Sequence, residues 1–310
     1  MISIASYTAD QVKTWDDFVN RSKMPMFMFN RGFMDYHADR FQDASLMFYR
    51  DDELLAVLPA SRHGDEIRSH GGLTYGGMIS GEKMKQHTML ECVDAMRDFY
   101  RATGVSSVLY KSIPHIYHRQ PAEEDAYALF RNGATLVKVE PSTVVNLAEP
   151  LKMPKGRKAQ ISRARREGVE VRETDDFEAF IALENEALKR HDVTAVHTAS
   201  ELRLLTSRFP NNIKCICGFL SGKLIAGTVL FVYDHVVHTQ YLCADEHARE
   251  IGALDLVVSG CIAQYRMTHR WLDFGISSED GGAWLNEGLI AQKEGFGGRT
   301  GVYETWGIDI

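Results

Sequence analysis

Arg249 and Gly252 are the first candidates for a ligand-binding site. They lie between an alternating segment and an apolar segment with helical spacing. Val236–Cys243 alternates with a period of two, which predicts a β-strand, and Leu254–His269 has helical spacing. A strand that opens into a helix through Arg-x-x-Gly leaves unpaired N–H groups at the positive end of the helix dipole. Such a segment is typical of a phosphate or pyrophosphate site. An ordinary strand-to-helix turn with a surface arginine is the alternative.

Two acid–base candidates lie on one predicted helix. Glu184 and His191 continue an apolar stripe that starts at Phe177 in the helix Asp175–Lys189. A carboxylate and an imidazole on a core-facing stripe need hydrogen-bond partners, or a cleft in which they can work. The sequence leaves two interpretations open: general acid–base chemistry, or a buried glutamate that a neighbouring arginine neutralises.

A third candidate lies on the strand Val236–Cys243. Strict alternation places His238 and Gln240 on one face of this strand, and Thr239 and Tyr241 on the other. His238 could deprotonate an attacking amine, because its ordinary pKa lies close to neutral. A half-buried histidine without a catalytic role is the alternative.

Asp273 and Lys293 are candidates on the elements that follow. Asp273 lies near the end of the predicted strand Trp271–Gly275, where layered α/β structures tend to place ligands. Lys293 lies on the predicted helix Trp284–Phe296, and its ammonium could stabilise a developing oxyanion or contact a substrate phosphate. These two residues join His238, Glu184 and His191 as the catalytic candidates.

Positive charge is concentrated in the segment Lys152–Arg172. It contains eight Lys/Arg and two Glu, which gives the segment a charge of +6. Because the net charge of the whole chain is −7, the remaining residues together carry −13. Arg163 and Arg166 lie within it and could bind a phosphorylated substrate or an RNA backbone. A solvated amphipathic helix is the alternative. Tyr75, flanked by two glycine pairs, is a further candidate for substrate contact, and turn glycines around it are the alternative.

Composition narrows the class of protein. With 310 residues, 45% of them hydrophobic and 25% charged, the chain is long enough for two globular domains. No apolar run approaches the ~20 residues of a membrane helix, and the N-terminus lacks a signal-peptide pattern, so we expect a cytoplasmic location. Five cysteines without Cys-x-x-Cys spacing argue against disulfides and structural zinc. No nucleophile motif, Walker loop or metal cluster is present.

The predicted elements repeat one order twice, in residues 1–148 and 149–310. The order is a strand, two helical segments, three strands, a helix, a strand, a helix and a closing strand. In the second half the predicted elements are Val169–Arg172, Asp175–Lys189, Ser200–Phe209, Ile213–Leu220, Leu224–Tyr233, Val236–Cys243, Leu254–His269, Trp271–Gly275, Trp284–Phe296 and Thr300–Trp306. In the first half, a helical segment is predicted between Met24 and Phe41, and two separate strands are predicted at Thr135–Val139 and Thr143–Leu147.

This order resembles the GNAT acyltransferase fold, and its tandem use is similar to the FemAB-like family. The basic helix Lys155–Val169, the stretch Trp271–Ile276 and the stretch Gln292–Gly297 carry the resemblance. It implies an α+β fold of two GNAT-like domains, each with a mixed, mostly antiparallel sheet flanked by helices. It also implies that acyl-CoA, such as acetyl-CoA, binds without a metal at Leu242, Ala244, Arg249, Gly252 and Ala253. The family's acyl-CoA loop continues with a second glycine, where this chain has Leu254.

The resemblance implies an N-acyltransferase in which Lys293 stabilises the oxyanion. The acceptor would be an amine on a sugar, a peptide or another small molecule, including a cell-envelope precursor. Two alternatives stay open: a transferase that uses aminoacyl-tRNA, bound through Lys152–Arg172, and a non-catalytic module that binds a glycan or a partner protein. The sequence does not predict the oligomeric state.

Overall fold

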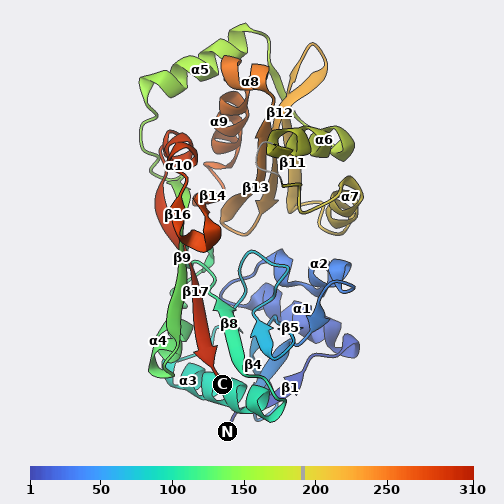
Figure 1. Ribbon diagram of the computed structural model, residues 1–310, viewed down its shortest axis with the longest axis vertical. Coiled ribbons are helices and arrows are strands. Elements are labelled where there is room, and N and C mark those ends of the chain that lie inside the picture. Colours follow the sequence, from blue (N-terminus) through green and yellow to red (C-terminus); the bar gives the residue numbers. More distant parts are fainter. Residues whose placement is uncertain (190–192) are drawn as a thin grey trace. The chain divides into compact units, whose positions relative to one another are not determined.

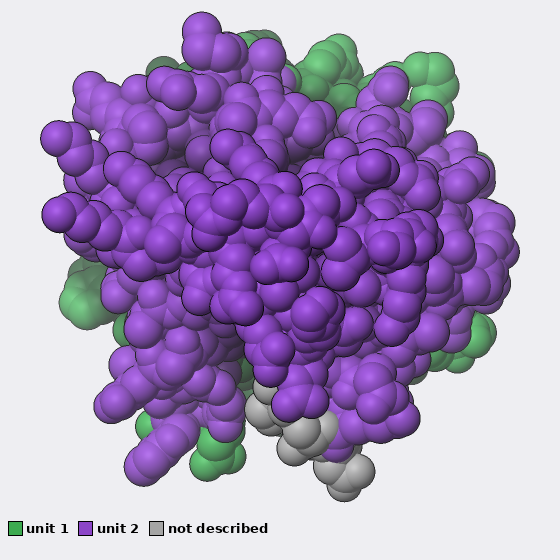
Figure 2. All heavy atoms as spheres, turned by 90° about the horizontal axis from the view of Figure 1, so that it is seen from above, with its two compact units in different colours: residues 1–140, 280–283, 302–310 green, residues 141–279, 284–301 purple. Residues whose placement is uncertain are grey.

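The computed structural model describes residues 1–189 and 193–310, which form two compact units. Unit 1 comprises residues 1–140, 280–283 and 302–310, and unit 2 comprises residues 141–279 and 284–301; the two are coloured separately in Figure 2. This division differs from the expected boundary at residue 148. The strand β17 (Arg299–Asp309) leaves unit 2 and pairs in unit 1 with β8 (Ser107–Lys111), so the closing strand of the second half belongs mainly to unit 1.

Unit 1 contains a four-stranded sheet and a group of strands around β8. The four strands follow the order β1-β3-β4-β7, and β6 pairs in parallel with β8 while β17 pairs with it antiparallel. Its remaining elements are β1 Ser3–Ser6, η1 Ala9–Gln11, α1 Val12–Arg21, η2 Phe27–Phe29, α2 Arg31–Met34, η3 Asp35–His37, β2 Gln42–Asp43, β3 Leu46–Arg50, β4 Glu53–Leu58, β5 Ser61–His63, β6 Glu66–Arg68, β7 Ile79–Ser80, α3 Gln86–Ala102, η4 His115–Tyr117 and α4 Glu124–Arg131.

Unit 2 has the GNAT element order that the sequence predicted. Its strands follow the order β10-β11-β12-β13-β14-β9, all antiparallel except for the parallel β13–β14 pair. The elements are β9 Thr135–Asn146, α5 Lys155–Arg166, β10 Glu170–Glu173, α6 Phe177–Leu188, α7 Ala199–Arg208, β11 Ile213–Leu220, β12 Lys223–Val232, β13 Val236–Ala244, α8 Glu246–Ile251, α9 Ala253–Tyr265, β14 Trp271–Ile276, β15 Ser278–Glu279, β16 Trp284–Leu285 and α10 Glu287–Glu294. The predicted α+β fold is confirmed.

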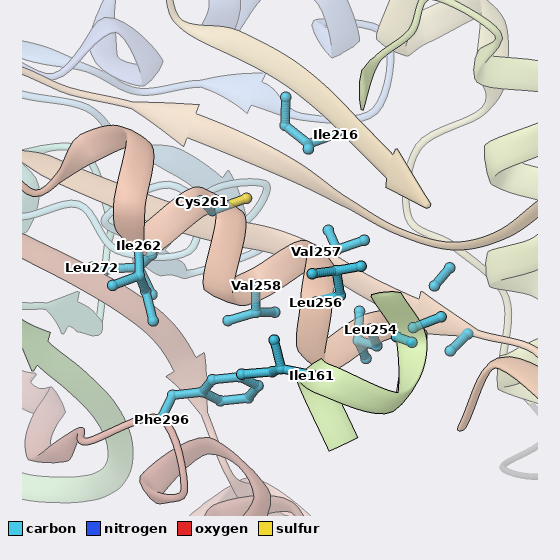
Figure 3. Close-up of a cluster of buried hydrophobic side chains, with 14 of the residues drawn as sticks. Ile161, Ile216, Leu254, Leu256, Val257, Val258, Cys261, Ile262, Leu272 and Phe296 are labelled. Carbon is cyan, nitrogen blue, oxygen red and sulfur yellow. The ribbon is translucent and has the colours of Figure 1, made fainter. Parts of the chain in front are cut away.

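Helices cover both faces of the unit 2 sheet (Figure 1). α9 packs on β11, β12 and β13 from one side, and α5 lies against α9; α6 packs on β12 and β13. The core on the α9 side is apolar and closely packed, with Ile161 of α5, Cys261 of α9 and Phe296 among its members (Figure 3). These two layers hold β13 and β14 in place.

Three local predictions were wrong. The helix expected over Trp284–Phe296 is shorter, because Trp284 and Leu285 pair with β15 and the Asn286 side chain caps α10 at the Leu289 N–H. The strands expected at Thr135–Val139 and Thr143–Leu147 form one strand, β9, which runs through Pro141. The helix expected between Met24 and Phe41 is three short helical segments, η2, α2 and η3.

Candidate active site

The parallel pairing of β13 and β14 stops after three residue pairs. Val236, Val237 and His238 face Trp271, Leu272 and Asp273, and beyond this point β14 pairs only with β9 in the described structure. β13 continues to Ala244 along β12. The two strands therefore separate immediately after the His238–Asp273 pair, which leaves the β14-facing edge of residues 239–244 without a strand partner among the described residues.

A β-bulge at Gln240 changes which side chains share a face of β13. Thr239 is paired with Leu230 and Tyr241 with Val229, so Gln240 is an extra residue. The expectation of strict alternation was therefore wrong. Val237 and Leu230 belong to the core on the α9 side, whereas the Tyr241 ring contacts Phe180 of α6. The bulge places His238 on the same face as Tyr241, the face that α6 covers.

His238 and Asp273 form a buried, hydrogen-bonded pair where the strands separate. The His238 Nδ1–H donates to Asp273 Oδ2 at 3.1 Å, and Asp273 has no exposed surface. The other carboxylate oxygen accepts from the Ser142 hydroxyl and from the Gly275 N–H at 3.1 Å. The carboxylate thus fixes the imidazole's orientation and its tautomer. The structure brings together two predicted residues, and it adds Ser142 from β9.

Lys293 reaches the same end of β14 from α10. Its Nζ donates to the carbonyl oxygens of Gly275 at 3.0 Å and Ile276 at 2.6 Å, and the side chain is 5% exposed. Burial lowers the pKa of Lys293 to about 8, although the nearby Asp273 carboxylate opposes this shift. An ammonium has three N–H donors, so two backbone contacts leave one donor for a ligand. A role for Lys293 as an oxyanion donor stays a prediction.

Glu184 lies on the α6 face, buried, and no arginine or lysine of the described residues forms an ion pair with it. The only hydrogen bond to its side chain that the described residues provide comes from the Cys243 thiol, and Oε2 has no partner. Burial raises the pKa of Glu184 to about 7, and the thiol contact opposes the shift. The interpretation of a glutamate neutralised by an arginine stays open, because Arg190, which follows α6, lies outside the described residues. His191, the other candidate from this stripe, lies outside the described residues.

The Arg249–Gly252 segment is a short helix rather than an open turn. α8 occupies residues 246–251, and the Asp245 carboxylate caps it by accepting the Ala248 N–H at 2.7 Å. Arg249 is exposed, and its guanidinium donates to Ala244 O at 3.0 Å. Asp245 caps α8, whereas α9, the helix expected to begin near Gly252, starts at Ala253 with Gly252 as its N-cap and without a side-chain cap among the described residues. A pyrophosphate contact at the start of α9 stays a prediction.

Gly252 is required for packing between helices. It has φ +78°, and a Cβ atom there would lie 2.7 Å from the Gln160 carbonyl oxygen of α5. α5 is also held by Arg157, which forms an ion pair with Asp255 of α9. Because α5 covers this corner, the glycine's free space is already taken by protein. The prediction that Gly252 admits a phosphate group therefore loses its steric basis.

The other residues predicted to bind the acyl donor lie on β13 or at the start of α9. Ala244 is buried at the end of β13, Leu242 is half-buried, and Ala253 is the buried first residue of α9. Leu242 belongs to the part of β13 that has no strand partner on the β14 side among the described residues. A contact between a donor and this strand edge stays a prediction.

The predicted substrate-binding residues have different surroundings. Arg166 is exposed on α5, whereas the Arg163 guanidinium donates to Glu250 O at 3.0 Å at the end of α8. Tyr75 is 1% exposed in unit 1, with ring centroids 5.0 Å from Tyr117 and 5.4 Å from Tyr303. This burial argues against direct substrate contact by Tyr75.

Sequence reasoning missed Ser142, and it assigned no role to Tyr241 or His197. The Tyr241 hydroxyl lies 2.6 Å from His197 Nδ1 and accepts the His197 N–H at 3.1 Å, on the α6 face. No local signal marks Ser142, because it is 131 positions from Asp273. A predicted β-bulge next to Tyr241 could have drawn attention to this residue. The sequence does not predict the bulge, because the extra residue is Gln240 and not a glycine or a proline.

The described residues contain no group of three or more His, Cys, Asp or Glu side chains that could hold a metal ion. None of the described helices has the length and apolar character needed to span a membrane.

The sequence and the structure were also compared with known proteins. Residues 155–281 match the sequence profile of the acetyltransferase (GNAT) domain, and no curated protein matches the chain. Solved structures share the fold at low identity. FemX has a TM-score of 0.69 at 9% identity, with 99% of this chain and 97% of that chain covered. L-PGS from Bacillus licheniformis has a TM-score of 0.66 at 13% identity, with 98% and 92% covered.

A third similar structure is that of a tandem GNAT protein. The tandem GNAT protein from the clavulanic acid biosynthesis pathway has a TM-score of 0.54 at 12% identity, with 100% of this chain and 98% of that chain covered. The expected resemblance is thereby confirmed: this chain shares its fold with FemX and with a tandem GNAT protein, and its residues 155–281 match the acetyltransferase (GNAT) domain model.

Proposed function

We propose that this protein is an N-acyltransferase whose reaction takes place in unit 2, where β13 and β14 separate. The observation that carries the proposal is the arrangement at that point. A buried His238–Asp273 pair ends the parallel ladder, and the Lys293 ammonium lies against the end of β14. A base and an oxyanion donor at the opening of a strand pair are the two groups that direct acyl transfer to an amine requires.

The reaction needs no covalent enzyme intermediate. The acceptor amine attacks the activated acyl carbonyl, a C–N bond forms, and the bond between the acyl carbon and the donor's sulfur or oxygen breaks. His238 takes the proton that the amine loses, while Asp273 keeps its imidazole oriented. The third N–H of Lys293 stabilises the oxyanion, and the leaving group of the donor takes up a proton. The acceptor amine belongs to a sugar, a peptide or a cell-envelope precursor.

Acyl-CoA is the donor that the GNAT domain supports, and its fit to this chain is partial. The open edge of β13 offers backbone groups to an acyl-pantetheine chain, next to the base. The α5 cover over Gly252 takes up the space through which a pyrophosphate could approach this glycine. The phosphates must then contact other groups, of which the exposed Arg249 is the nearest along the chain.

A purified full-length protein supplied with acetyl-CoA and mixed primary amines tests this assignment. We expect free coenzyme A and an N-acetylated product, both detected by mass spectrometry. Aminoacyl-tRNA is supplied in a parallel reaction with the same amines. A protein that consumes neither donor would contradict the proposal and favour a non-catalytic binding module.

A second donor, aminoacyl-tRNA, is favoured by the surface of α5. Arg165 and Arg166 are exposed there together with Lys155 and Lys158, while Ile161 and Ala164 on the same helix are buried. A row of exposed cations on a well-anchored helix is suited to a nucleic-acid backbone. The α5 cover over Gly252 takes up room that the pyrophosphate of acyl-CoA needs and that an RNA-linked donor does not.

Replacing Arg165 and Arg166 together with glutamine tests the second donor. If aminoacyl-tRNA is the donor, we expect its KM to rise roughly tenfold at low salt and less at high salt, because released counterions drive such contacts. The melting temperature should stay within a few degrees, because exposed charges contribute at most ~1 kcal/mol each. Arg203→Gln, an exposed arginine on α7, is the matched control. Equal KM values at every ionic strength would leave α5 as a solvated surface.

A further inference from the structure

Gly275 of β14 has a left-handed backbone inside a strand. Its φ is +71°, a conformation that favours glycine over residues with a side chain. The register of β14 against β9 shifts between Asp273 and Ile276, so Gly275 lies in the irregular part of the strand. This part follows directly after His238–Asp273, the last parallel pair of β13 and β14. The left-handed residue thus lies where the two strands separate.

Both backbone groups of Gly275 contact candidates for the reaction. Its N–H donates to Asp273 Oδ1 at 3.1 Å, which forms an Asx turn, and its carbonyl oxygen accepts from Lys293 Nζ at 3.0 Å. The second oxygen of the same carboxylate accepts from His238 Nδ1 at 3.1 Å. The conformation of this one residue therefore affects the position of the base and of the ammonium.

The missing side chain of Gly275 leaves room for the His238 imidazole. A Cβ atom at residue 275 would lie 3.3 Å from His238 Cε1 and 4.0 Å from its Nε2. The first distance is shorter than an ordinary contact between carbon atoms, so the ring would have to move by a few tenths of an ångström. Because Asp273 holds Nδ1, this movement displaces Nε2, the atom that takes the amine's proton in the proposed reaction.

We propose that Gly275 is a positioning residue: its left-handed conformation and its missing side chain fix the His238 imidazole relative to the Lys293 ammonium. Gly275 acts through these two groups, one on each side of its own backbone. The inference rests on the proposed function, because it concerns the same site. A residue with a Cβ atom at this position would displace the base even where the fold is kept.

Gly275→Ala tests the space beside the ring. We expect the turnover number of acyl transfer to fall roughly tenfold or more with unchanged KM, because a misplaced base affects the chemical step. Gly133→Ala is the matched control. Gly133 has φ +74°, and no heavy atom of the described residues, apart from its chain neighbours, lies within 4 Å of a Cβ atom there.

The control variant should lower the melting temperature by a similar amount and keep its turnover number, since it introduces the same backbone strain without a new contact. Unchanged turnover in Gly275→Ala, or an equal loss of turnover in both variants, overturns the inference.

Gly275→Asn separates the missing side chain from the backbone strain. Asparagine adopts left-handed φ values more readily than alanine, so Gly275→Asn and Gly133→Asn should both regain part of the melting temperature that the alanine variants lose. The turnover number of Gly275→Asn should stay low, because the Cβ atom next to His238 remains. Recovery of turnover together with the melting temperature would show that backbone strain alone caused the loss, and would overturn the inference.

Nitrogen NMR of histidine-labelled protein observes the imidazole without any acyl donor. The His238 signals are identified by their absence from His238→Gln. We expect Gly275→Ala to shift these signals and Gly133→Ala to leave them unchanged. His238 signals that are the same in the wild-type protein and in Gly275→Ala contradict the positioning role.

The two proposals can fail separately. If no donor is consumed but Gly275→Ala alone shifts the His238 signals, the positioning role of Gly275 stands and the transferase proposal falls. If acyl transfer occurs and Gly275→Ala changes neither the His238 signals nor the turnover number, the transferase stands and the role of Gly275 falls.

Discussion

Lys293→Met is expected to lower the turnover number of acyl transfer by roughly 10²–10³, with little change in the KM of either substrate. Methionine keeps most of the apolar stem in its buried place, so the change removes mainly the ammonium. A positive charge near the carbonyl oxygen helps only when that oxygen becomes negative, and its loss therefore affects the transition state. Steady-state kinetics with each substrate varied in turn separates turnover from affinity.

The same substitution also leaves the Gly275 and Ile276 carbonyls without their donor, which costs about 1–3 kcal/mol of stability. Lys111 in unit 1 allows this effect to be subtracted. Its Nζ donates to His70 O at 2.7 Å and to Leu73 O, and burial lowers its pKa to about 8 as well. Lys111→Met should lose similar stability and keep its turnover number. Equal turnover losses in both variants would make Lys293 a structural residue.

The lowered pKa of Lys293 predicts how the turnover number changes at alkaline pH. With a pKa of about 8, the side chain is an ammonium below pH 8 and loses its charge above it. The turnover number should accordingly fall above pH 8 in the wild-type protein. The residual turnover of Lys293→Met should lack this decrease.

Asp273→Asn is expected to lower turnover by roughly 10²–10⁴, because a misoriented imidazole no longer acts as a general base. An ionised Asp273 accepts hydrogen bonds from His238, Ser142 and the Gly275 N–H. An asparagine presents an N–H₂ group to one of these donors, and either the His238 tautomer or the Ser142 contact must change. Steady-state kinetics of the variant and of the wild-type protein measures the loss.

Ser142→Ala is the matched control for Asp273→Asn. It removes one donor to the same carboxylate but leaves the contact between His238 and Asp273 in place. We expect it to lower stability by about 1 kcal/mol and turnover by far less than Asp273→Asn does. Equal losses of turnover in the two variants would show that the cluster supports the fold and does not orient a base.

The order of the helices and strands, and therefore the fold class, could be predicted from the sequence alone. Alternating segments became β11, β12 and β13, and the helix after Arg249–Gly252 became α9, because period and burial are coupled within a single element. The sequence also named His238, Asp273, Lys293 and Glu184 as polar residues in apolar surroundings, and all four are buried. Such local patterns contain no information about which distant residue becomes a partner.

The remaining features of the fold and of the site could not be predicted from the sequence, because they depend on contacts between residues far apart in the chain. The Ser142–Asp273 hydrogen bond joins positions 131 apart, and the passage of β17 into unit 1 is set by its pairing with β8. One extra residue at Gln240 reverses the facing of His238 without changing the composition of β13. The approach of α5 to Gly252 occupies a space that the local motif alone predicted to be open, because a glycine admits a neighbouring backbone as readily as a phosphate.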